Sequence, residues 1–162
     1  MGLQYRKKCI KAYSRVQIIN RLEYAGICEG ELITIYKLFI RSICEYSSSV
    51  FHTLLTQELS DKLEAIQKTA LKIILADKYI DYQTSLEHFS IDTLYTRRQK
   101  HMEKFAIKCT EDKFNHLMFP INQNVRGKDL FEVSFPRTSQ YLKSTIPQCQ
   151  RFLNNHSKMN TS

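Results

Sequence analysis

The chain has 162 residues, of which 43% are hydrophobic and 25% are charged, values typical of a globular protein with one buried core. Only four glycines and three prolines interrupt it, which favours helices over the tight turns of an all-β fold. Apolar runs of about four to six residues are far shorter than the roughly 20 needed to span a bilayer. The basic segment 1–15 lacks the apolar stretch of a secretory signal, so we expect an intracellular protein, cytoplasmic or nuclear, with no membrane partner.

The net charge of +8 lies mostly at the two ends of the chain. Residues 1–22 carry six basic and no acidic side chains, and residues 120–162 carry six basic and two acidic ones. The middle is close to neutral, with twelve basic and fourteen acidic side chains. Ordered basic ends are typical of proteins that bind a polyanion, but lysines can also simply keep a chain soluble. The charge distribution alone does not decide between these two interpretations.

The first predicted helix covers residues 4–24 and ends near Gly26. Four of its cations fall within a sector of roughly 100° at 3.6 residues per turn. These are Lys7, Lys8, Lys11 and Arg15. Apolar side chains lie mostly on the other side of the helix, namely Cys9, Ile10, Tyr13 and Val16.

A second helix is predicted over residues 30–53 and is apolar almost all round, so we expect it to be the most buried one. Its serines at positions 47–49 are poor helix formers and favour a bend or an end there. A third helix is predicted over 57–76 with Thr56 as its N-cap. Its water-facing side is expected to carry Asp61, Glu64, Lys68 and Lys72.

Gln67 lies at the flank of the apolar stripe of this third helix, between isoleucine and leucine neighbours. A buried amide needs hydrogen-bond partners. We therefore predict that Gln67 is at least half buried and bonded to a neighbouring helix or loop.

Two further helices are predicted over residues 82–89 and 93–109, the second capped by Ser90 or Asp92. Four basic side chains of the second recur at steps of four, three and four residues and share one face: Arg97, His101, Lys104 and Lys108. Arg98 points instead into the apolar side, where a structural ion pair with Glu87 or Asp92 is expected.

After Pro120 the pattern changes, so we place a boundary there: a helical domain at 1–119 and an extended basic tail at 120–162. Residues 121–129 read as a polar loop, 130–135 as a short strand, and 144–155 as a short helix with Pro147 near its start. The predicted fold is mainly α, a small bundle of about five helices with an irregular C-terminal tail.

No catalytic or metal-binding motif is found. Gly-rich phosphate loops and Gly-x-Ser-x-Gly elbows are missing from the sequence, and its carboxylates are scattered along helices. The five cysteines are odd in number and none has Cys-x-x-Cys spacing, which favours reduced thiols. Cys109 and His116 form at most half of a metal knuckle. We therefore predict no catalytic residues, no metal and no other cofactor.

Four blocks nevertheless occur in an informative order: "IYKLFIRSICEYSSSVFH" (35–52), "LEAIQKTALKIIL" (63–75), "YQTSLEHFSIDTLYTRRQKHMEKFAIK" (82–108) and "RTSQYLKSTIPQCQRFLN" (137–154). They resemble the C-terminal part of reverse transcriptases of non-LTR retrotransposons, the jockey and related LINE-like elements. The resemblance covers roughly residues 5–154 and corresponds to the thumb and the segment after it. The family's aromatic-Ala-Asp-Asp box is missing, and the nearest segment is "LADKY" at 75–79.

The resemblance implies a thumb-like helical fragment of an RNA-directed DNA polymerase that is inactive on its own and binds RNA or an RNA–DNA duplex. The cations expected to contact phosphates are Lys7, Lys8, Lys11, Arg15, Arg97, Lys104 and Lys108. The alternative is a helical interaction or structural module without nucleic-acid binding, which self-associates through exposed apolar helix surface.

Overall fold

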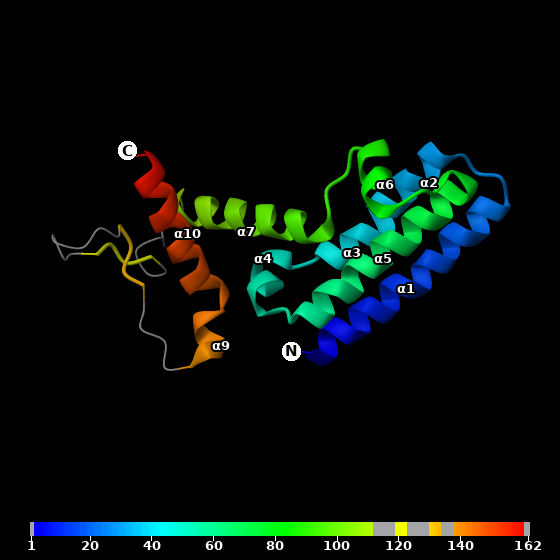
Figure 1. The fold of residues 1–162 in the computed structure, drawn as a ribbon. Coiled ribbons are helices and arrows are strands. Elements are labelled where there is room, and N and C mark those ends of the chain that lie inside the picture. Colours follow the sequence, from blue (N-terminus) through cyan, green and yellow to red (C-terminus); the bar gives the residue numbers. More distant parts are fainter. Residues whose placement is uncertain (1, 112–118, 123–129, 134–137, 161–162) are drawn as a thin grey trace. The chain divides into compact units, whose positions relative to one another are not determined.

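The computed structural model describes residues 2–111, 119–122, 130–133 and 138–160 (Figure 1). Apart from a single antiparallel β-bridge between Ile121 and Phe131, the regular structure in these ranges is helical, which confirms the predicted mainly α fold. The chain forms two compact units. Unit 1 combines residues 1–46 with 56–97, and unit 2 combines residues 47–55 with 98–162.

Unit 1 is built around two long helices, α1 (Gly2–Tyr24) and α5 (Gln57–Leu75), which pack side by side (Figure 1). Between them in sequence come α2 (Glu29–Ile35), the π-helical turn η1 (Tyr36–Arg41) and α3 (Ser42–Glu45). After α5 follow the 3₁₀ turn η3 (Ala76–Lys78), α6 (Tyr82–His88) and the first turn of α7 (Leu94–Glu111). The core contains Ala12, Val16, Ile19, Leu32, Tyr36, Ile40, Leu63, Ile66, Ala70, Leu71 and Ile74.

The first helix ends as predicted, because Gly26 adopts a left-handed backbone with φ of 83°. The amide of Gly26 donates to the carbonyl of Glu23, and the amide of Ile27 donates to that of Leu22. This pair of bonds is the Schellman motif, which satisfies the last carbonyls of a helix.

The second predicted helix is broken, as the serine cluster indicated. Ser47 has a φ of 58°, and the chain ends α3 there before it forms α4 (Ser48–Phe51) and the 3₁₀ turn η2 (His52–Leu54) of unit 2. The prediction that this helix is the most buried one is wrong, since Leu38 is 62% exposed and Phe39 is 53% exposed, whereas α5 buries more of its residues. Only one side of α2 and η1 faces the unit 1 core, where Leu32, Tyr36 and Ile40 are buried.

The third helix matches its prediction closely. The Thr56 hydroxyl accepts a hydrogen bond from the amide of Leu59 at 3.4 Å and so caps α5. Gln67 is fully buried. Its Oε1 accepts from the Tyr36 hydroxyl at 2.7 Å, and its Nε2 donates to the Asp92 carbonyl at 3.1 Å. This amide therefore joins η1, α5 and the segment before α7.

Glu64 differs from its prediction, because it is not part of the water-facing side of α5. Its carboxylate accepts hydrogen bonds from the Tyr82 hydroxyl at 2.7 Å and from the amides of Leu94 at 3.4 Å and Tyr95 at 2.6 Å. A side chain on α5 thus caps the start of α7. The N-cap is Thr93, whose hydroxyl accepts from the amide of Thr96 at 3.1 Å, rather than Ser90 or Asp92.

Unit 2 contains α4, η2, the rest of α7, α9 (Ser139–Leu142) and α10 (Thr145–Asn160). A small core of buried residues joins α7 and α10 to the bridged segments: Met102, Ala106, Phe119, Phe131 and Cys149. The Asn154 amide supports this core, since its Nδ2 donates to the Phe131 carbonyl at 3.0 Å and its Oδ1 accepts from the Phe131 amide at 2.8 Å.

The division of the chain therefore differs from the predicted boundary at residue 119. Residues 98–111 belong with the C-terminal part, which is a packed unit containing the 16-residue helix α10 instead of an extended tail. The strand expected at 130–135 is a single bridge at Phe131 where it is described. The predicted loop at 123–129, residues 134–135 and His116 lie outside the described residues.

Candidate nucleic-acid interface

The predicted basic face of α1 is only partly open to solvent. Lys7 and Lys11 are exposed. Lys8 is half-buried: its Nζ donates to the Tyr46 carbonyl at 3.2 Å and lies 5.1 Å from the centre of the Tyr46 ring. Burial lowers the pKa of Lys8. This lysine therefore has an intramolecular role in holding the end of α3 against α1.

Arg15, the fourth cation of this set, borders an apolar groove between α1 and η1. The groove has a volume of about 250 Å³ and is lined by Arg15, Ile18, Leu22, Ile35, Phe39 and Ile40. The apolar side chains predicted on the other side of α1 are not all buried, because Ile10 is 69% exposed and Tyr13 is 47% exposed. The N-terminal helix thus presents cations beside apolar side chains, which differs from a purely phosphate-binding face.

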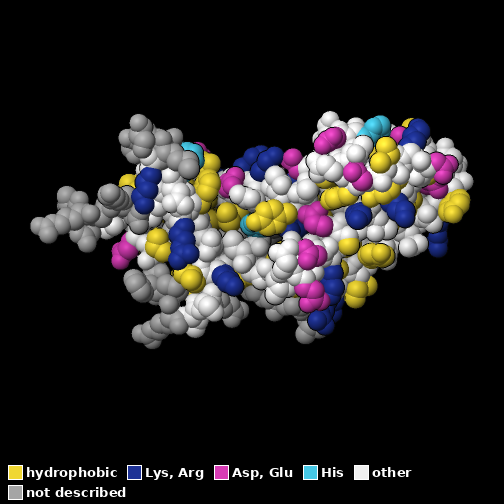
Figure 2. Space-filling view, viewed as in Figure 1, with side chains coloured by type: hydrophobic (Ala, Val, Ile, Leu, Met, Phe, Trp, Pro, Cys, Tyr) yellow, Lys and Arg dark blue, Asp and Glu magenta, His cyan; other side chains and the backbone are white. Residues whose placement is uncertain are grey.

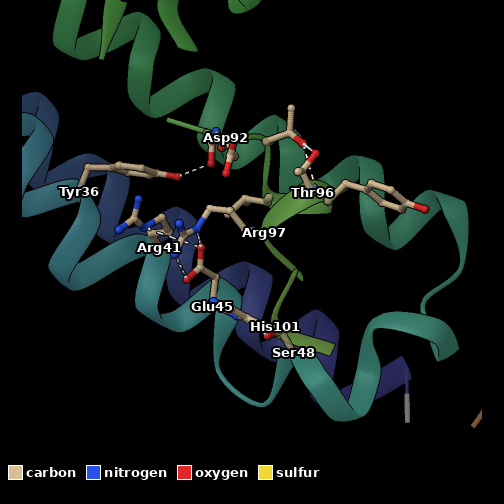
Figure 3. Close-up of polar contacts among 12 residues, drawn as sticks. Tyr36, Arg41, Glu45, Ser48, Asp92, Thr96, Arg97 and His101 are labelled. Atoms are coloured by element: carbon tan, nitrogen blue, oxygen red, sulfur yellow. Dashed lines mark hydrogen bonds and ion pairs between the residues drawn. The ribbon is translucent and has the colours of Figure 1, made fainter. Parts of the chain in front are cut away.

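Arg97 lies in an ion-pair cluster within unit 1 (Figure 3). Its Nε and Nη2 both donate to the carboxylate of Glu45, the Nη2 bond measuring 3.0 Å, and Arg41 lies 3.7 Å from the same carboxylate. The hydrogen bond with Glu45 raises the pKa of Arg97. A cation committed to a carboxylate in this way is a poor phosphate ligand, so we omit Arg97 from the candidate interface.

The two other predicted cations of α7 are exposed, namely Lys104 and Lys108. Lys100 is exposed too and completes a row at i, i+4 and i+8, in which each lysine stands about 6 Å further along the helix. His101 does not join this row, because its Nδ1 forms a 2.9 Å hydrogen bond with the Ser48 hydroxyl. Lys100 was not predicted, because the basic face expected from the sequence runs through Arg97 and His101 and leaves Lys100 at its edge.

A second group of cations, on α9 and α10 and in the turn between them, was also missed. Lys143, Arg151 and Lys158 are exposed, and no acidic side chain occurs anywhere in residues 133–162. Arg151, Asn155 and Lys158 share one exposed face of α10 at 3.6 residues per turn. Figure 2 shows Lys and Arg side chains at intervals over this part of unit 2. The signal available in the sequence was the acid-free run, which was assigned to an extended tail with one short helix.

The two units also differ in net charge. Unit 1 carries thirteen basic and eleven acidic side chains, a net charge of +2, whereas unit 2 carries eleven basic and five acidic ones, a net charge of +6. Most of the positive excess of the chain therefore lies in unit 2, with Lys104, Lys108, Lys143 and Arg151 among its exposed cations.

In the part of the chain that the structure describes, no three His, Cys, Asp or Glu side chains gather closely enough to hold a metal ion, and none of the five cysteines forms a disulfide. Within "LADKY", Asp77 is exposed in η3, next to Lys78, which pairs with Glu29 at 2.5 Å. Arg98 is 1% exposed, in keeping with its predicted direction, and its ion pair with Glu87 or Asp92 stays a prediction. None of the described helices has the length and apolar character needed to cross a bilayer.

Comparison of the chain with protein-family models, with curated proteins and with solved structures finds no match. The function is therefore inferred from the residues and their geometry, together with the resemblance of the four sequence blocks.

Proposed function

We propose that this chain comprises the thumb and post-thumb region of a non-LTR retrotransposon reverse transcriptase, and that unit 2 binds RNA or an RNA–DNA template–primer through phosphate contacts. The observation that carries the binding proposal is the acid-free surface of α9 and α10, within the same unit as Lys104 and Lys108 of α7. Phosphate contacts require ordered cations and no base-reading groups.

The charge distribution supports unit 2 over unit 1 as the binding unit. The α1 cations are partly committed, since Lys8 contacts Tyr46 and Arg15 borders an apolar groove. Arg97 is paired with Glu45. In unit 2, by contrast, Lys143 and Arg151 are exposed on segments that carry no carboxylate to neutralise them. A net positive field over one unit also attracts a polyanion at long range.

The proposed family origin is supported by the order of the four blocks, which fall on α2 to η2, α5, α6 to α7, and α9 to α10. We further propose that these residues do not polymerise by themselves. Asp77 belongs to the segment most similar to the family's catalytic box, and it is exposed at the end of a helix beside Lys78. A primer-extension assay with the purified chain tests this part, and templated incorporation of nucleotides would refute it.

Binding is tested by a salt titration with labelled single-stranded RNA and three double variants. Lys104→Gln/Lys108→Gln and Lys143→Gln/Arg151→Gln each remove two proposed phosphate contacts. Each should make the negative slope of log K against log salt shallower by about 1.4, at roughly 0.7 per contact with a single strand. The control Lys68→Gln/Lys72→Gln removes two exposed cations of α5 and should leave the slope unchanged.

The alternative function is a helical interaction or structural module with no affinity for nucleic acid. Exposed apolar side chains on α1 and η1 favour it, including Ile18, Leu38 and Phe39. The same titration separates the two functions. If the unmodified chain does not bind RNA at low salt, or if binding does not weaken as salt rises, the nucleic-acid proposal is refuted and the alternative stands.

A further inference from the structure

The groove between α1 and η1 is an almost wholly apolar concavity of unit 1. Ile18 and Leu22 form one wall, Phe39 the other, and Ile35 and Ile40 line it as well. Ile18 is 51% exposed and Phe39 53% exposed, so two large apolar side chains stand in water at its edges. A groove of this composition is suited to the apolar side chains of a partner helix.

Cations extend from one end of this groove along the same side of α1. Lys7, Lys11, Ile18 and Leu22 fall within a sector of about 60° on the helix, and Arg15 lies next to them. Lys7 and Lys11 are exposed, and the first 22 residues contain no carboxylate. The face thus has an apolar half near η1 and a cationic half towards the N-terminus.

We propose that this face binds an acidic amphipathic helix of a protein partner. Apolar side chains of that helix occupy the groove at Ile18 and Phe39, and its carboxylates pair with Lys7, Lys11 and Arg15. The distance along α1 from Leu22 to Lys7 is about 22 Å, at 1.5 Å per residue, which corresponds to about four turns of a partner helix. The proposal uses residues of unit 1 only and is independent of RNA binding by unit 2.

Two other occupants fit this face less well. A second copy of the chain in a two-fold symmetric dimer would present this same face, whose α1 part offers no carboxylate to pair with Lys7, Lys11 and Arg15. RNA would satisfy the cations, but its phosphates do not fill a groove lined by Ile18, Leu22, Ile35 and Ile40. An acidic amphipathic helix matches the charge and the apolar surface together.

The test uses the full chain and two labelled peptides of about 20 residues, each with leucines at helical i, i+3, i+4 and i+7 spacing. One peptide carries glutamates at its remaining positions and the other carries lysines there. Fluorescence anisotropy measures their affinity for the unmodified chain and for variants whose helix content is checked by circular dichroism.

We expect the glutamate peptide to bind and the lysine peptide to bind at least about 10-fold more weakly. Ile18→Asp or Phe39→Asp should weaken binding of the glutamate peptide at least about 10-fold, because each places a carboxylate in the groove. Ile80→Asp is the matched control, since Ile80 is 80% exposed in unit 1 and does not line the groove. It should leave binding unchanged.

Charge reversal provides the decisive comparison. The Lys7→Glu/Lys11→Glu variant should no longer bind the glutamate peptide and should bind the lysine peptide. The control Lys68→Glu/Lys72→Glu should change neither affinity. Equal binding of both peptides, or no binding of either, would overturn the proposal. Dimerisation that Phe39→Asp abolishes would also overturn it and would identify a second copy as the occupant. Loss of RNA binding in Lys7→Glu/Lys11→Glu would overturn it as well and would identify RNA as the occupant.

Discussion

Replacing Gln67 by leucine is the sharpest test of how unit 1 is held together. The substitution keeps a side chain of similar size at a fully buried position but removes both polar atoms of the amide. The Tyr36 hydroxyl loses its 2.7 Å acceptor, and the Asp92 carbonyl loses its 3.1 Å donor. Tyr36 is itself fully buried, so water cannot replace the missing acceptor.

The expected loss follows from the desolvation of these groups. Leaving a buried polar group without its partner costs about 1–3 kcal/mol. The Asp92 carbonyl is only partly buried and recovers some of its loss from water. We therefore expect Gln67→Leu to lower the free energy of unfolding by about 2–4 kcal/mol, and Tyr36→Phe by about 1–2 kcal/mol.

The assay is urea unfolding followed by circular dichroism for both single variants and the double variant. If the two side chains bond to each other, the double variant should be less destabilised than the sum of the single effects by about 1–2 kcal/mol. Additivity of the two effects within about 0.5 kcal/mol would refute the bond. A loss below about 0.5 kcal/mol for Gln67→Leu would refute its buried role.

Three further predictions concern other parts of the structure. Glu64→Ala should destabilise the chain by about 1–3 kcal/mol in urea unfolding, because α7 loses its capping carboxylate, whereas Asp61→Ala on the exposed side of α5 should cost under about 0.5 kcal/mol. Asn154→Ala should cost about 2–4 kcal/mol and speed amide exchange in α10 first, since both backbone groups of Phe131 lose their partner; exchange that changes only in α5 would contradict this. Burial raises the pKa values of Tyr36 and Tyr82, so the free energy of unfolding should be independent of these two groups below a pH of about 10. Above that pH it should fall by up to about 1.4 kcal/mol per pH unit for each tyrosine, because the unfolded chain loses the phenol protons first. A Tyr36→Phe/Tyr82→Phe variant with the same alkaline slope would contradict this.

Features determined by local chemistry were predicted from the sequence. The Thr56 cap, the end of α1 at Gly26 and the break at the serine cluster each depend on a few adjacent residues. The burial of Gln67 was predictable as well, because a lone amide at the edge of an apolar stripe needs partners. The identity of its partners, Tyr36 and Asp92, was not, since they lie 31 and 25 residues away in sequence.

Features determined by tertiary contacts were missed for the same reason. Glu64 was predicted to face water, but it reaches the amides at the start of α7, 30 and 31 residues further along the chain. Arg97 was taken for a phosphate ligand, but Glu45 lies beside it across a sequence separation of 52 residues. Helical periodicity assigns a side chain to a face without showing which other element covers that face.

Ultraviolet crosslinking of the full chain to labelled RNA, with mass spectrometry of the crosslinked peptides, shows whether RNA binds the cations of unit 2. We expect crosslinks in residues 98–111 and 138–160, which contain Lys104, Lys108, Lys143 and Arg151. Crosslinks confined to α1 or to the exposed side of α5 around Lys68, or none at all at low salt, would contradict it.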